Sequence, residues 1–178
     1  MTRLHRMLAF VPLAALVACE PATTEPTMQV AAPTLARSAN APVHRVTGGG
    51  KLDISAFDPT LPPETYGFTA SVDGNGNVKG QLQADFSAPD VTFHMEITCL
   101  SVNGNNAWMG GTVTQTHDAT IIPVGTHFFV QVQDNGEGNA AAPDRMSFFF
   151  FVGNPAVCNA QLTFGLPFAW LHGNIQVE

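Results

Sequence analysis

Three carboxylates lie close together in one Gly-rich stretch of the chain. They are Asp134, Glu137 and Asp144, and carboxylate oxygens are the ligands that a hard cation such as Ca²⁺ prefers. If the stretch folded back on itself, the three side chains would converge on one ion. A solvated hairpin is the commoner reason for acids in a Gly-rich loop, so these residues are weak candidates for a metal site, and we expect no cofactor.

Histidines supply the other candidate chemistry. His94 and Glu96 are two residues apart and would share one face of a strand, whereas a zinc site needs three or four converging ligands. The sequence has no Gly-x-Ser-x-Gly turn to present a nucleophilic serine. A hydrolase would therefore have to assemble its site from distant residues such as His94, Glu96 and His127. The absence of a converging catalytic set favours a non-enzymatic protein.

The beginning of the chain has the order of an export signal. Arg3 and Arg6 precede an apolar run over 7–18, and this run is shorter than the ~20 residues that a transmembrane helix needs. It ends in Leu16-Val17-Ala18-Cys19, which resembles the bacterial lipobox. The resemblance implies cleavage before Cys19, a lipid on its thiol and fatty acylation, for example by palmitate, of the new amino terminus. An ordinary secretory peptide cleaved elsewhere is the alternative.

The lipobox resemblance also implies a location. Each buried CH₂ contributes about 0.8 kcal/mol, so two or three acyl chains hold a protein firmly where one chain binds marginally. Glu20 is not the aspartate of an inner-membrane retention signal. We therefore expect a lipid-anchored protein that faces the periplasm or the cell surface, on the outer membrane if the cell has two membranes.

Charge excludes one class of partner. Two of the 7 basic residues precede Cys19, so a chain beginning there keeps 5 against 14 acids, a formal net charge of −9. This balance disfavours nucleic acid and equally disfavours a polybasic contact with anionic lipid. We expect membrane attachment to come from the acyl chains alone.

Cys99 and Cys158 are the remaining thiols. An exported chain with two spare thiols usually oxidises them, which predicts a disulfide. The alternative is that Cys99 is a small buried hydrophobe and Cys158 is unpaired.

The composition divides the chain into three parts. Residues 1–18 are the expected signal peptide, 19–42 a flexible tether rich in Pro, Ala and Thr, and 43–178 a single all-β domain. A tether of this length would place the domain roughly 25 Å from the lipid surface.

Apolar residues in the domain often alternate with a period of two, which is typical of antiparallel strands. Val91, Phe93, Met95, Ile97 and Cys99 would share the core face of one strand. No helix is expected in the domain. Strands are predicted near 44–48, 51–56, 65–72, 78–86, 91–102, 107–116, 126–133, 145–153, 157–165 and 172–177.

Short turns between these strands predict an antiparallel meander, which must close into a small β-barrel or fold into a two-layer β-sandwich to cover its edges. The Gly-containing segments 47–50 and 173–177 could pair as first and last strands. This pairing favours closure slightly.

Several segments together resemble a family of small, poorly characterised, secreted bacterial β domains, which implies a compact extracytoplasmic module without a known catalytic activity. The matching segments are Val46-Thr47-Gly48-Gly49-Gly50, Tyr66-Gly67-Phe68, Gly80-Gln81-Leu82-Gln83, Ile97-Thr98-Cys99-Leu100, the stretch 130–137 that ends in Asp134-Asn135-Gly136-Glu137, and Gly173-Asn174-Ile175-Gln176-Val177.

The run Ser147 to Val152 contains four consecutive phenylalanines and is apolar on both faces. Its ordinary interpretation is a central strand covered on both sides. The alternative is an exposed apolar patch or a barrel interior that takes a partner or a small lipophilic ligand. Our first hypothesis is a non-enzymatic structural or interaction lipoprotein, with a carrier of a lipophilic ligand and a hydrolase with an unrecognised site as alternatives.

Overall fold

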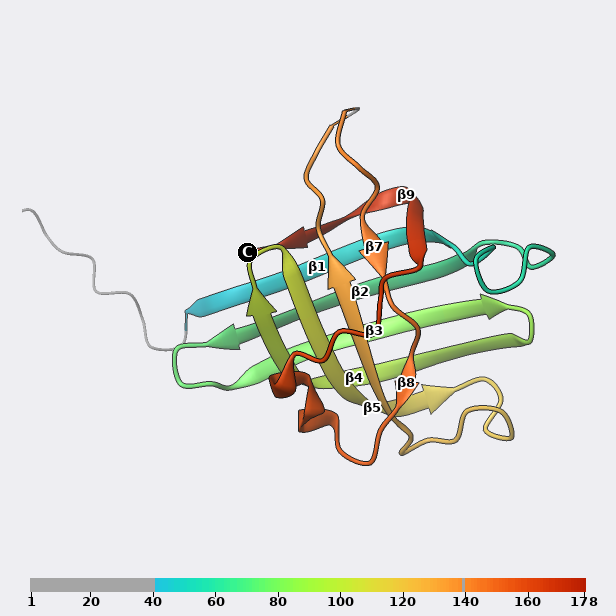
Figure 1. Ribbon diagram of the computed structural model, residues 1–178. Helices are drawn as coiled ribbons and strands as arrows, with labels where there is room; N and C mark the ends of the chain where they lie inside the picture. The colour runs from blue at the N-terminus through green and yellow to red at the C-terminus, as the bar shows by residue number, and fades with distance from the viewer. Residues whose placement is uncertain (1–40, 139) are drawn as a thin grey trace, which may run out of the picture. The chain divides into compact units, whose positions relative to one another are not determined.

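The computed structural model describes residues 41–138 and 140–178 (Figure 1). The predicted signal peptide, Cys19 and nearly all of the predicted tether lie outside the described residues. Within the described part, no helix has the length and apolar character needed to cross a membrane. The elements are β1 (Pro42–Asp53), β2 (Glu64–Asp73), β3 (Val78–Ser87), β4 (Asp90–Asn103), β5 (Asn106–Thr116), β6 (His127–Gln133), β7 (Arg145–Met146), β8 (Phe150–Phe151), the 3₁₀ helix η1 (Pro155–Ala160) and β9 (Phe168–Val177).

The strands form one antiparallel sheet that closes on itself. Their order is β5-β4-β3-β2-β1-β9-β7-β6-β8, and the additional pairing of β5 with β6 closes the series into a ring, with the short strand β8 also paired to β6. The predicted all-β meander is confirmed. Closure gives each of the long strands β1 to β6 a neighbour on both sides, which removes the exposed edges that promote aggregation.

The first and last strands pair in the predicted way. Thr47 lies opposite Gln176, and Gly49 lies opposite Asn174. The two backbones approach closely at Gly173, whose φ is +96° and whose position leaves no room for a Cβ atom beside the carbonyl oxygen of Gly49. A glycine is therefore required where the ring closes.

The main core fills the inside of the ring. Side chains from alternate positions of each long strand meet there, as the period of two predicts. Representative members from five strands are Val46, Tyr66, Leu82, Phe93 and Val130, all at most 6% exposed.

The predicted core face of β4 is wrong at one residue. Val91, Phe93, Met95 and Ile97 do belong to the main core, but the pairing of β4 with β5 is irregular between Ile97 and Cys99. An extra residue in one strand turns the following side chains to the other face. Cys99 consequently belongs to a second, smaller cluster.

Several strand predictions and the expectation of no helix are also corrected. Residues 44–48 and 51–56 belong to one continuous strand, β1, and η1 is a short 3₁₀ helix. The segment 157–165 is not a strand, because it holds most of η1 followed by irregular chain, and 145–153 contains only the two-residue strands β7 and β8. The strand that is buried on both faces is β6 instead. Its outer residues Phe129 and Gln131 are 0% and 2% exposed, and η1 packs over β4, β5 and β6 on this side (Figure 1).

The two ends of the ring differ in their connections. At one end, here called the turn end, short turns join β2 to β3 and β4 to β5, and the loop 134–144 follows β6. At the other end, here called the open end, the longer loops 54–63 and 117–126 follow β1 and β5, both on the right in Figure 1. The residues of these two loops therefore lie beside the strand ends on this side of the ring.

Candidate functional site

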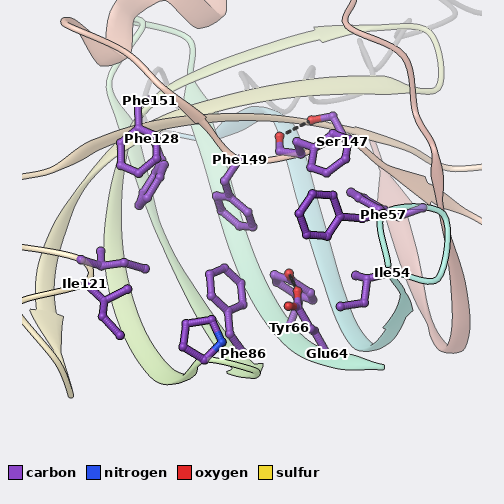
Figure 2. Close-up of a pocket in the computed structure, with 14 residues that line it drawn as sticks. Ile54, Phe57, Glu64, Tyr66, Phe86, Ile121, Phe128, Ser147, Phe149 and Phe151 are labelled. Carbon is purple, nitrogen blue, oxygen red and sulfur yellow. Dashed lines mark hydrogen bonds between the residues drawn. The ribbon is translucent and has the colours of Figure 1, made fainter. Parts of the chain in front are cut away.

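An apolar cavity of about 300 Å³ lies at the open end of the ring (Figure 2). This volume is at the lower limit of the range typical of small-molecule sites. Glu64 is the one acidic side chain among the lining residues, and no basic side chain is among them. The lining residues are Ile54, Phe57, Glu64, Tyr66, Phe86, Pro89, Ile121, Ile122, Phe128, Ser147, Phe148, Phe149, Phe151 and Phe168.

Strand ends supply the walls of the cavity. Tyr66 lies near the start of β2, Phe86 near the end of β3 and Phe128 near the start of β6. In an antiparallel meander these three positions fall at the same end of the sheet. Figure 2 shows the three rings around one opening. The loops add Ile54 and Ile121 from opposite sides.

The phenylalanine run forms another wall. Ser147 holds this segment to β6, since its amide donates to the carbonyl of Gln131 (2.9 Å) and its hydroxyl accepts from the amide of Gln131 (2.9 Å). Phe149 then packs against Tyr66 and Phe128, with ring centroids 5.7 and 5.5 Å apart. Phe151 is 71% exposed. The prediction of a regular central strand here is wrong, and the segment instead follows β6 as a wall of the cavity.

The rim of the cavity is unusually apolar for a surface in contact with water. Phe57 and Phe151 are 67% and 71% exposed, while Ile121 and Phe148 are 44% and 38% exposed. Single exposed hydrophobic residues are ordinary, but a contiguous group around a cavity indicates a binding site.

The cavity contains one buried polar pair. Glu64 and Tyr66 are 8% and 4% exposed, and the Tyr66 hydroxyl donates a hydrogen bond to Oε2 of Glu64. Burial raises the pKa of the Glu64 carboxyl; the Tyr66 hydrogen bond acts in the opposite direction, and the charge of Asp85 adds to the increase. Burial raises the pKa of Tyr66 as well, and the charge of Glu64 and the hydrogen bond to Glu64 add to this increase.

The pair was missed in the sequence, although a signal was present. Glu64 stands two residues before Tyr66 and four before Phe68, so the period of two places a carboxylate on the core face of β2. An acid in that position departs from the pattern of a purely structural strand, and such departures are expected at functional sites.

The three acids of the 134–144 loop hold the backbone at the turn end. Asp144 accepts from the amides of Asn135 (2.8 Å) and Ile175 (2.6 Å), and Asp134 accepts from the amide of Val177 (3.0 Å). Glu137 accepts from the side chain of Asn174. Within residues 41–138 and 140–178, no group of three or more His, Cys, Asp or Glu side chains is placed to hold a metal ion. In this structure the three carboxylates fasten the loop to β9.

The residues of the hydrolase hypothesis lie on the outer face of the ring. Glu96 is opposite Thr112, which is opposite His127, so Glu96 and His127 are two strands apart, about 10 Å by the usual strand spacing. The Thr112 hydroxyl lies 2.9 Å from Nδ1 of His127. His94 lines a different depression, beside Gln81 and Gln83.

The predicted disulfide between Cys99 and Cys158 is confirmed, with Cα atoms 6.1 Å apart. It fastens η1 to the outer face of β4. With Trp108 and Phe129 the two cysteines form the second cluster, which is separate from the main core. At Gly110 an added Cβ would overlap the carbonyl of Pro155, so this glycine lets η1 lie directly against β5.

Comparison with known protein families, curated proteins and solved structures finds no match to this chain. The resemblances to the lipobox and to secreted β domains therefore stay predictions.

Proposed function

We propose that the protein is a carrier that holds a small lipophilic molecule in the cavity at the open end of the ring. The observation that supports this function is an apolar cavity of about 300 Å³ with exposed phenylalanine and isoleucine side chains around its rim. Moving apolar surface of a ligand out of water contributes roughly 25 cal/mol per Å². An apolar molecule would also cover the exposed rim.

The cavity favours this role over a purely structural one. A domain that serves only as a spacer has no need of an apolar opening, which promotes aggregation in water. The general interaction role remains the alternative, in which a protein partner instead of a small molecule covers the same rim.

The proposal includes the location that the lipobox resemblance implies. We propose that acyl chains on Cys19 hold the domain at a membrane surface, outside the cytoplasm. A carrier placed there by its tether could exchange an apolar ligand with the membrane or with a neighbouring protein over a short distance.

A dye titration tests the carrier function. The full chain with Cys19→Ser, which carries no acyl chain, is titrated with a fluorescent apolar dye, and binding is followed by the rise in dye emission. We expect saturable binding at one site, which Ile121→Asp weakens because it places a charge on the rim. Asp90→Asn, an exposed change at the start of β4, is the control. Absence of saturable binding by the unsubstituted chain would contradict the proposal.

A further inference from the structure

We propose that the ligand of this cavity is a lipophilic cation, an apolar body with a protonated amine, whose ammonium group binds the Glu64 carboxylate. The inference rests on the carrier function proposed above and names the class of ligand. It follows from the position of Glu64, from the aromatic rings around it and from the charges of the open end.

Glu64 is a nearly buried acid whose hydrogen-bond partner is the neutral hydroxyl of Tyr66. No basic side chain is among the residues that line the cavity. An ionised carboxylate in apolar surroundings is costly unless a positive charge accompanies it. A neutral ligand that filled the cavity would remove the remaining water from Glu64 and increase this cost, whereas an ammonium group would offset it.

Aromatic rings stand next to this carboxylate. Tyr66, Phe86 and Phe149 contact one another, with ring centroids between 5.7 and 6.1 Å apart. Figure 2 shows these rings above and beside the Glu64 and Tyr66 oxygens. Aromatic faces attract ammonium groups and do not attract anions, so this wall of the cavity favours a cationic ligand.

The ionisable groups around the open end are mostly acidic. Hydrogen bonds from the hydroxyl and amide of Thr60 lower the pKa of Asp58, and those of Thr120 act in the same way on Asp118, so both rim loops are negative at neutral pH. A negative opening attracts cations from solution. Near the open end, the ionisable groups on the elements around Glu64 are Lys51 and Asp53 on β1, Asp58 in the 54–63 loop, Tyr66 on β2, Asp85 on β3, Asp90 on β4, His117 and Asp118 after β5, His127 at the start of β6, and His172 on β9 opposite Lys51.

Lys51 is the basic residue nearest in register, and it does not satisfy Glu64. It lies opposite Thr65, whereas Leu52 lies opposite Glu64. Lys51 is exposed and Leu52 is buried, so the lysine projects from the outer face of the ring. Among the residues that the structure describes, the cavity lining thus offers Glu64 no ammonium group, and a cationic ligand would supply it.

Three probes with the same alkyl chain test the inference. Octylammonium, 1-octanol and octanoate are titrated separately into the full chain with Cys19→Ser, and displacement of the apolar dye gives each dissociation constant. We expect octylammonium to bind roughly tenfold to a hundredfold more tightly than octanol, because a hydrogen bond between charged groups contributes an affinity gain of this size. Octanoate should bind most weakly.

Glu64→Gln should bring octylammonium and octanol to similar affinity, because the amide keeps the shape and the Tyr66 contact but loses the charge. Asp85→Asn is the matched control, since it removes a carboxylate from the exposed face of β3 and should keep most of the preference. Should Glu64→Gln fail to fold, the unsubstituted chain gives the same information, because its preference for octylammonium should decline as acid protonates Glu64.

The outcomes separate the two proposals. Three outcomes would overturn the cation inference and leave the carrier function standing. They are equal affinity for the three probes, tighter binding of octanoate, and an ammonium preference that survives both Glu64→Gln and acid. If neither the three probes nor the dye bound to the protein, the carrier function itself would be overturned.

Discussion

Removal of the Cys99–Cys158 disulfide should lower the stability of the whole ring. The two cysteines are 59 residues apart, and in the chain-entropy model a cross-link over a loop of this length stabilises the folded state by about 4 kcal/mol. This is a large part of the about 5 to 15 kcal/mol that holds an ordinary domain folded. The effect arises in the unfolded chain, so it should reach all parts of the native structure equally.

Urea unfolding measures this effect. The double variant Cys99→Ala/Cys158→Ala is compared with the oxidised and the reduced parent chain, all with Cys19→Ser so that no third thiol is present. The two tryptophans report on different regions, because Trp108 belongs to the second cluster and Trp170 to the main core. We expect both signals to shift together to lower urea, by the equivalent of about 4 kcal/mol.

One result would refute this reasoning. If the Trp108 signal changed at low urea while the Trp170 transition kept its midpoint, the disulfide would hold only η1 against β4. The loop-closure estimate would then be irrelevant to the ring. Single-tryptophan variants, Trp108→Phe and Trp170→Phe, assign each signal.

Three further perturbations follow from the structure, and a fourth follows from the lipobox resemblance. Glu64→Gln should remove a loss of stability that the unsubstituted chain shows with rising pH. Burial raises the pKa of the Glu64 carboxyl above its ordinary 4.5, so the folded chain holds this proton more tightly than the unfolded chain, and stability falls as pH increases from 4.5 through the folded-state pKa. Urea midpoints that depend equally on pH in both proteins would contradict this prediction. Gly173→Ala places a Cβ against the carbonyl of Gly49 at a φ of +96° and should cost more than about 2 kcal/mol in thermal unfolding; an unchanged melting temperature would count against the close approach. Phe149→Ala should cost about 3 kcal/mol and enlarge the cavity, so longer alkyl probes should bind better relative to short ones, and an unchanged length preference would argue against Phe149 as a wall. Cys19→Ser should abolish palmitate incorporation and move the protein out of the membrane fraction, and unchanged labelling and fractionation would refute lipidation at that residue.

The strand pattern of the ring could be predicted from the sequence because it depends on local periodicity. The alternation around Phe93 gave β4, and the glycines near Gly49 and Gly173 indicated which strands close the ring. The position of Cys99 could not be predicted, because one irregular pair in the β4–β5 register reverses the faces that follow. Nothing in the local sequence of β4 marks that irregularity.

The phenylalanine run shows a second limit of sequence reasoning. Residues apolar on both faces indicate that both faces are covered, but not by what. Here β6 is covered on its outer side by η1, which the disulfide holds in place, while the run itself has Phe149 in the cavity and Phe151 in water. Long-range packing decided which of two apolar segments became the buried strand.

The two ends of the ring use carboxylates in opposite ways, and this contrast argues for function at one of them. At the turn end, Asp144 accepts two backbone hydrogen bonds and fastens a loop, so its burial has a structural reason. At the open end, Glu64 is almost as buried, yet it accepts a hydrogen bond from a neutral phenol and faces an apolar cavity. A leucine or methionine in its place would fill the same space without the cost of burying an acid. A buried carboxyl that accepts from a phenol, as the one acidic side chain of an apolar cavity, is best explained by what enters that cavity.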